Sequence, residues 1–185
     1  MITGHLGVAL AARGCWRRAP LFWLLAASVA PDVLDTALAA TGICNPWGLY
    51  SHTLPAATVL AAVVGGFVFL VAGGASAGRT AGLLAAGLVL VHLPLDFITG
   101  NKLYWPGGEL LGLRVYDRPV IDFAIESTLL VGGWMYLRRD ARGPAFATSR
   151  MALVVALALQ GAADLSSRGF KLSACDRLPP MTMQP

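Results

Sequence analysis

The stretch from Val91 to Pro106 contains a histidine and a carboxylate at the point where an apolar segment gives way to a polar one. His92 and Asp96 are four residues apart, so on a helix they lie on one face, one turn apart. Ionisable side chains inside an apolar segment are costly and usually mark a functional site. Pro94 between them weakens the helical hydrogen bonding and frees a carbonyl group. We therefore expect His92 and Asp96 to bind a metal ion near the end of a membrane helix.

The composition is that of an integral membrane protein. Hydrophobic residues make up 56% of the 185 residues and charged residues only 13%, about half of the roughly 25% that is usual in soluble domains. Several apolar runs approach the roughly 20 residues that cross a bilayer as a helix. We predict an all-α, polytopic membrane bundle of about five to six helices. It forms a single domain over residues 1–165, followed by a loosely ordered tail over residues 166–185.

The apolar runs and the turn-forming residues between them place the individual helices. The first helix, over residues 1–14, is short for a span, and the sequence leaves open whether it crosses the membrane. Pro119 suits the first turn of a later helix. The remaining helices are expected at about 20–40, 52–75, 80–98, 119–137 and 151–165.

Arginines concentrate in the loops on one side of the predicted bundle, which are residues 13–18, 75–79 and 138–150. These basic residues are Arg13, Arg17, Arg18, Arg79, Arg138, Arg139, Arg142 and Arg150. Lysine and arginine are enriched in cytoplasmic loops. We therefore expect the two long loops, and both termini, to face outward from a bacterial inner membrane.

The net charge and the number of cysteines bear on the expected partners and on disulfides. The net charge of +4 is explained by bases that flank membrane segments. No basic helix with interleaved aromatics is present, so we expect membrane lipids as partners and no nucleic acid.

Three cysteines are too few and too scattered for a disulfide scaffold or a cysteine zinc site. Cys44 and Cys175 would share the oxidising side, and whether they pair is left open.

Eight ionisable side chains from different predicted helices fall at a similar depth near the outward side. Each has an ordinary explanation alone, as a hydrogen-bonded packing histidine, a capping carboxylate or an ion-pair partner, but these explanations do not account for the shared depth. The expected metal ligands are His5, Asp32, His52, His92 and Asp96. The expected further ligands or general bases are Asp35, Asp122 and Glu126. The outer-loop bases expected to hold an anionic head group are Lys102, Arg114 and Arg118, although charge beside lipid phosphates explains them equally well.

The ligand types narrow the choice of metal. Imidazole and carboxylate ligands suit a divalent ion, with zinc expected first and manganese or iron as alternatives, and the lack of cysteine ligands argues against a closed structural zinc site. Carboxylates that bridge two ions would suit a two-metal hydrolytic site. The sequence leaves open whether one or two ions bind.

In their order along the chain, several short motifs resemble the YdjM-like family. They are Gly4-His5, Pro31-Asp32-x-x-Asp35, Ser51-His52-Thr53, His92-Leu93-Pro94-Leu95-Asp96 with Thr99-Gly100, and Trp105-Pro106. The family is described as LexA-binding, inner membrane-associated metal-dependent hydrolases, and the resemblance covers about residues 1–137. Members often carry a fuller His-Arg-x-x-Thr-His-Ser segment, so one ligand of the family pattern is missing here. A distant similarity of the family to zinc phospholipase C and single-strand nucleases implies phosphoester chemistry.

The expected function is that of a membrane-bound, metal-dependent hydrolase. It would use a metal-activated water on a phosphoester, lipid or lipid-linked, at the outer face of the membrane. One alternative is a transporter or ion pathway, because intramembrane acids and proline-broken helices also occur there. Another is a non-catalytic membrane binding or scaffold protein. No serine-hydrolase elbow, P-loop or dinucleotide fingerprint is present in the sequence.

Overall fold

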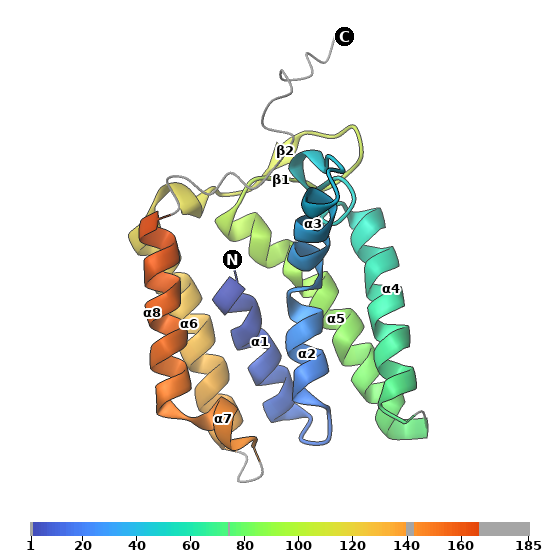
Figure 1. Cartoon of the computed structure of the whole chain (residues 1–185), viewed down its shortest axis with the longest axis vertical. Coiled ribbons are helices and arrows are strands. Elements are labelled where there is room, and N and C mark those ends of the chain that lie inside the picture. The colour runs from blue at the N-terminus through green and yellow to red at the C-terminus, as the bar shows by residue number, and fades with distance from the viewer. Residues whose placement is uncertain (1, 74, 140–142, 167–185) are drawn as a thin grey trace.

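The computed structural model describes residues 2–73, 75–139 and 143–166, and helices dominate these segments (Figure 1). In chain order the elements are α1 (Ile2–Cys15), α2 (Leu21–Ser28), α3 (Ala30–Ala40), the 3-10 turn η1 (Pro46–Gly48), α4 (Leu54–Val71), α5 (Ala75–Thr99), β1 (Lys102–Leu103), β2 (Leu110–Leu111), the 3-10 turn η2 (Val115–Asp117), α6 (Pro119–Arg138), α7 (Ala145–Thr148) and α8 (Arg150–Ser166). The predicted all-α class is confirmed. Nearly all of the predicted tail, with Cys175, lies outside the described residues.

Three helices are long and apolar enough to cross a membrane. They are α4, α6 and the part of α5 from Ser76 to Thr99. The pair α2 and α3 passes the same test jointly, although the two helices are bent by 60°. The helices α1, with 14 residues, and α8, with 17, are shorter than the roughly 20 residues that a straight span needs. The described residues thus contain three candidate spans, or four if the bent pair is one span, and the predicted number of five to six stays a prediction.

The helix expected over residues 20–40 is broken into α2 and α3 at Val29. The backbone of Val29 leaves the helical region, with φ −111° and ψ 6°. Pro31 has no N–H to donate to the carbonyl one turn earlier, so it cannot continue α2, and it lies in the first turn of α3 instead. The break aims the first turn of α3, which carries Asp32, toward α5.

Glycines allow the helices to pack closely against one another. A Cβ atom on Gly133 of α6 would lie 1.9 Å from the carbonyl oxygen of Gly7 in α1, and one on Gly82 of α5 would lie 2.6 Å from that of Gly65 in α4. Only hydrogen atoms fit at these contacts, as is usual where membrane helices touch. On the opposite face of α4, large apolar side chains such as Val63 are exposed, which suits contact with lipid.

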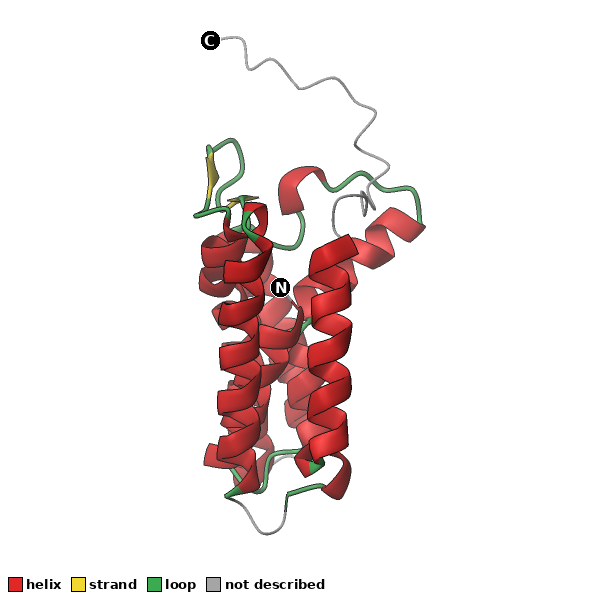
Figure 2. Ribbon diagram, turned by 90° about the vertical axis from the view of Figure 1, so that its left-hand side faces the viewer, coloured by secondary structure: helices red, strands yellow, loops and turns green. Residues whose placement is uncertain are grey.

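The connections separate into two groups at opposite ends of the bundle. The α1–α2 and α4–α5 connections and α7 lie at one end, and β1, β2 and α3 lie at the other (Figure 1). Figure 2 shows the two short strands at the end of the bundle, outside its helical body. They pair antiparallel, with Lys102 opposite Leu111. The described residues of the three arginine-bearing segments, 13–18, 75–79 and 138–150, therefore lie at one end, as the sequence predicts.

Candidate metal centre

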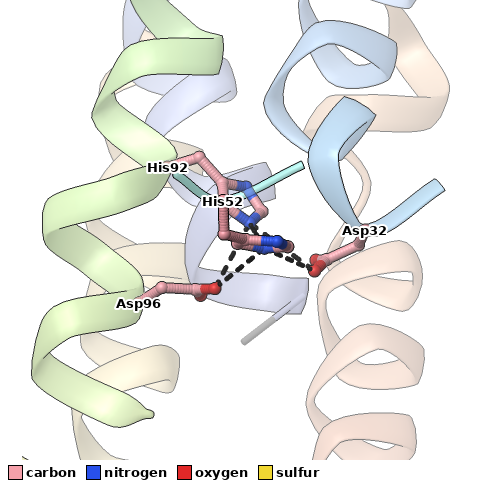
Figure 3. A group of neighbouring side chains, drawn as sticks. All are labelled: Asp32, His52, His92 and Asp96. Atoms are coloured by element: carbon pink, nitrogen blue, oxygen red, sulfur yellow. Dashed lines mark hydrogen bonds and ion pairs between the residues drawn. The ribbon is translucent and has the colours of Figure 1, made fainter. Parts of the chain in front are cut away.

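Four of the five predicted ligands meet at one point near the loop end of the bundle. Asp32 comes from the first turn of α3, His52 from the residue pair before α4, and His92 and Asp96 from one face of α5 (Figure 3). Each offers one ligand atom, and these four atoms lie within 4.8 Å of one another. The i,i+4 spacing thus brings His92 and Asp96 to the same point.

The atoms that face one another are two imidazole nitrogens and two carboxylate oxygens. The Nε2 atoms of His52 and His92 are 3.2 Å apart. Asp96 Oδ2 lies 3.1 Å from the first and 3.6 Å from the second. Asp32 Oδ1 lies 3.5 Å from both. Both histidines and Asp96 are buried, whereas the side chain of Asp32 is 30% exposed, so the centre opens on the α3 side.

The protonation of His92 follows from its partner on the far side of the ring. Its Nδ1 lies 2.9 Å from the carbonyl oxygen of Ser28. A carbonyl oxygen can only accept, so Nδ1 carries the hydrogen and the neutral ring has its lone pair on Nε2. Ser28 ends α2 at the break before α3, and a continuous helix would have used that carbonyl for its own backbone. The break at Val29 therefore also orients His92.

The protonation of His52 follows from a closed network around Ser51. The Ser51 hydroxyl donates to Asp35 Oδ1 and accepts from Asn45 Nδ2 at 3.1 Å. A hydroxyl has one hydrogen, so its 2.7 Å contact with His52 Nδ1 requires Nδ1–H to donate to Ser51. Asn45 also donates to Asp35 Oδ1. His52 is thus held, like His92, with its lone pair on Nε2.

These assignments test whether a metal ion fits the residues present. Two lone pairs and two carboxylate oxygens face one point, and none of the four can donate to another while both imidazoles are neutral. A proton on one Nε2 would relieve one of these contacts, whereas a divalent cation attracts all four donor atoms at once. Two nitrogens and two oxygens are a donor set that zinc accepts. The residues therefore fit a metal ion.

The local backbone explains why His52 can reach the centre from a loop. Gly48 has φ +79°, and a Cβ atom there would lie 2.9 Å from Nδ1 of His52, so this turn needs glycine both for its conformation and for its space. The His52 N–H donates to the Gly48 carbonyl at 2.7 Å. Thr53 then leads into α4 in extended conformation. The turn formers around Gly48 were visible in the sequence, but this role for them was not.

His5 lies beside the four residues and is outside the group that could share one ion. Its ring stacks on that of His92, with centroids 3.8 Å apart. Its Nε2 lies 3.7 Å from Asp96 Oδ1, the carboxylate oxygen that faces away from the other imidazoles. The structure therefore places His5 where it can orient Asp96, at the buried edge of the centre.

Asp35 contacts the centre through His52. Its Oδ2 lies 3.4 Å from His52 Nδ1, while its Oδ1 accepts hydrogen bonds from Ser51 and Asn45. A carboxylate behind a ligand histidine orients the ring and raises its basicity. From this position Asp35 supports a ligand and does not itself belong to the four residues whose ligand atoms meet.

Glu126 and Asp122, the other two expected acids, lie on α6 without contacting the four residues. Glu126 Oε2 accepts from the Thr3 hydroxyl at 2.8 Å, the Thr3 N–H at 3.2 Å and the Gly4 N–H at 3.4 Å. A carboxylate at the unpaired N–H groups of a helix start is stabilising. The Thr3 hydroxyl oxygen also lies 3.0 Å from the side-chain amide oxygen of Gln160 in α8. Asp122 is buried, and its Oδ1 has no hydrogen-bond partner in the described part of the chain.

Only one of the three predicted anion-binding bases reaches the centre. Lys102 Nζ lies 3.9 Å from Asp96 Oδ2 and 3.9 Å from Asp35 Oδ2. Arg114 is exposed and pairs with Asp117 at 3.1 Å, and Arg118 is exposed at the start of α6. The spacing of these three bases in the sequence did not predict that the loop would place Lys102 at the centre and the two arginines away from it.

Sequence reasoning missed several supporting residues. The carbonyl of Ser28 holds the His92 ring. Asn45 donates to Ser51 and Asp35 behind His52, and Gln160 contacts Thr3. Ser51 belongs to a motif that was noted, but it was given no role. The available signal was Ser51 directly before His52. The partners are far apart in sequence, so the pairing itself was not visible.

Comparisons with known proteins add no assignment. No family model, no curated protein and no solved structure matches this chain.

Proposed function

We propose that this chain is a membrane-embedded, metal-dependent hydrolase of the YdjM-like kind, acting on a phosphoester that is a lipid or is linked to one. The observation that carries the proposal is the meeting of two Nε2 lone pairs and two carboxylate oxygens at a partly open edge of the bundle. Zinc is the proposed ion, because it accepts mixed nitrogen and oxygen ligands with an open position.

The chain's own residues supply what hydrolysis requires. A divalent ion in such a site lowers the pKa of a water molecule so that hydroxide is available near neutral pH. Ser28 and Ser51 hold the two imidazoles in the tautomer that ligates. Asp32 Oδ2 has no hydrogen-bond partner among the described residues, so it is the acceptor we propose for the proton of the water.

The membrane setting supports a lipid substrate. The centre lies toward the loop end of the bundle, and the outer faces of α4 and α6 expose large apolar side chains such as Phe67 and Val120. A site at that depth reaches a head group whose chains stay in the bilayer. The arginine-rich opposite end supports an inner-membrane protein whose site faces outward.

Metal analysis of the purified protein tests this proposal. We expect about one equivalent of zinc in the wild type and loss of most of it in His92→Ala, with Asp117→Asn, an exposed acid outside the centre, as the matched control. Hydrolysis of phospholipids or polyprenyl phosphates should stop after chelation and return with zinc. Activity that survives complete removal of metal, or no hydrolysis of any such substrate, would contradict the proposal.

A further inference from the structure

We propose that Lys102 forms, together with the metal centre, a binding site for a terminal phosphate group. This inference deepens the proposed function and rests on it. It names phosphomonoesters, whose phosphate carries several unshared oxygens, as the substrate class.

The ammonium group of Lys102 contacts the same oxygen that faces the two imidazoles. Its Nζ lies 3.9 Å from Asp96 Oδ2, which itself lies 3.1 Å from His52 Nε2. Among the residues that the structure describes, no other lysine or arginine pairs with the carboxylates of the centre. Lys102 is therefore the one described base placed at the reacting point.

The three N–H donors of Lys102 remain available. Distances of 3.9 Å to Asp96 and Asp35 are those of ion pairs, longer than the 2.7–3.2 Å of hydrogen bonds. No hydrogen bond of this ammonium to another described residue is formed. Asp35 already accepts from Ser51 and Asn45, so its lone pairs are partly used. The ammonium group thus has charge and donors for a further acceptor.

The backbone that carries Lys102 is held against two helices. Its strand, β1, pairs with β2. Two residues after Lys102, the backbone carbonyl of Tyr104 accepts the N–H of Leu54 at 2.8 Å. The Tyr104 hydroxyl donates to the carbonyl of Leu93 at 2.9 Å. Burial, with a smaller contribution from the Asp96 carboxylate, raises the pKa of the Tyr104 phenol above its usual value, so this donor keeps its proton.

The partial exposure of Lys102 places its head at the opening of the centre. Its side chain is 24% exposed, close to the 28% of Asp35 and the 30% of Asp32, whereas Asp96 is 4% exposed and the histidines are buried. A ligand that enters therefore meets Asp32, Asp35 and Lys102 before it meets the imidazoles. Of these three, only Lys102 attracts an anion.

Charge explains why a phosphate would follow the metal. Asp96 and Asp35 neutralise Lys102 while no cation lies on Asp96 Oδ2. A divalent cation there would balance the charges of its two carboxylate ligands, Asp96 and Asp32. Of its two described ion-pair partners, Lys102 would keep only Asp35 as a counter-ion. The ion and the ammonium group would then be the two cationic groups at the opening. A phosphomonoester offers one oxygen to each, whereas a zwitterionic diester head group brings a cation of its own. The site therefore favours terminal phosphate.

Calorimetry tests the inference. It measures the binding of inorganic phosphate to the purified protein in detergent, with and without saturating zinc. We expect the zinc-loaded wild type to bind inorganic phosphate, and Lys102→Gln to bind it about 10- to 100-fold more weakly, as loss of a charged hydrogen bond implies. Lys102→Arg should retain most of the affinity. Arg114→Gln, which removes an exposed loop base, should bind like the wild type.

Zinc titration of the same variants separates this inference from the proposed function. Lys102→Gln should bind zinc at least as tightly as the wild type, because a positive charge beside Asp96 is removed. If zinc-loaded Lys102→Gln binds phosphate as well as the wild type, or the zinc-loaded wild type binds none, the phosphate site is refuted while the metal centre stands. If the wild type binds no zinc, the proposed function itself fails.

Vesicles distinguish a lipid phosphate from free phosphate as the ligand. We expect the reconstituted zinc-loaded protein to lose inorganic phosphate binding when the phosphatidylcholine bilayer also contains phosphatidic acid, because the lipid competes for Lys102. Pure phosphatidylcholine should not compete. Equal competition by both vesicles would contradict the preference for terminal phosphate.

Discussion

The side chains that hold His52 form a network in which each assigned hydrogen has one acceptor. Asn45 and Ser51 donate to Asp35, and His52 donates to Ser51. Such outer partners fix which ring nitrogen carries the hydrogen and which binds a metal. The affinity of the centre for a metal ion should therefore depend on residues that do not themselves contact the ion.

Ser51→Ala and Asp35→Asn test this dependence. We expect each to weaken zinc binding by about 10- to 100-fold, the usual effect of losing an outer-shell partner, with Ser51→Ala acting through the lost acceptor for His52 Nδ1–H. Competition against a chelator of known affinity measures the change, and Asp117→Asn serves as the exposed-acid control. Wild-type affinity in Ser51→Ala would show that this hydroxyl does not set the His52 tautomer.

Residue types and spacing were sufficient to predict the four clustered side chains, because ionisable groups at membrane depth have few roles. The i,i+4 spacing of His92 and Asp96 predicted their shared face. The roles of Asp35 and Glu126 could not be predicted in the same way. Each lies at the expected depth, but its partners, Ser51 for the first and Thr3 for the second, are set by how distant helices pack.

At the level of whole elements, α1 depends on α6 for its position. Its first turn lies inside the bundle, about midway along the helices (Figure 1), and Thr3 and His5 are buried. Glu126 accepts three hydrogen bonds from that turn, and glycines bring the two helices into backbone contact. Glu126 thereby places His5 against Asp96, since His5 directly follows Gly4, the last residue whose N–H it accepts.

Replacement of Glu126 should loosen this helix. Glu126→Ala leaves buried donors of Thr3 and Gly4 without an acceptor, at about 1–3 kcal/mol each, so we expect a clearly lower unfolding temperature in detergent. Glu126→Gln, which keeps one oxygen, should cost less. Circular dichroism during heating measures both.

Asp122→Asn is the matched control, one turn away on α6. Asp122 is as buried as Glu126, but its Oδ1 has no hydrogen-bond partner in the described structure. Removal of its charge should therefore leave the unfolding temperature unchanged or raise it. An equal loss in Asp122→Asn and Glu126→Ala would mean that burial of the acids, and not the contact with α1, governs stability.

Helix positions were predictable to within a few residues from the apolar runs, since membrane helices are long and their ends carry turn formers. The expected fifth helix over 119–137 is α6, Pro119–Arg138, and the sixth over 151–165 is α8, Arg150–Ser166. The break at Val29 was not predicted. Pro31 signalled a disturbed helix, but a single proline does not predict a bend of 60°.

For the whole molecule, the distribution of arginines and the arrangement of the ends agree. Residues 13–18, where α1 ends, and residues 75–79, the first turns of α5, lie at the same end as α7, and the strand that carries Lys102 lies at the other (Figure 1). The metal centre lies on the side of the arginine-poor end. Because bases concentrate on the cytoplasmic side, this geometry predicts that the centre opens away from the cytoplasm.

Reporter fusions at Gly107 and Gly143 test the orientation. Gly107 lies in the loop between β1 and β2, in open space with φ +77°, and Gly143 lies before α7 at the opposite end. Alkaline phosphatase, which needs an oxidising compartment for its disulfides, should be active when fused at Gly107 and inactive at Gly143, and a fluorescent protein that folds only in the cytoplasm should give the reverse. The expected difference follows from the arginines on one side alone, since acidic residues contribute little to orientation. Phosphatase activity at Gly143 alone would place the centre on the cytoplasmic side. Activity at both positions would contradict the predicted alternation of the helices. Either result would contradict an outward-facing lipid phosphate as the substrate.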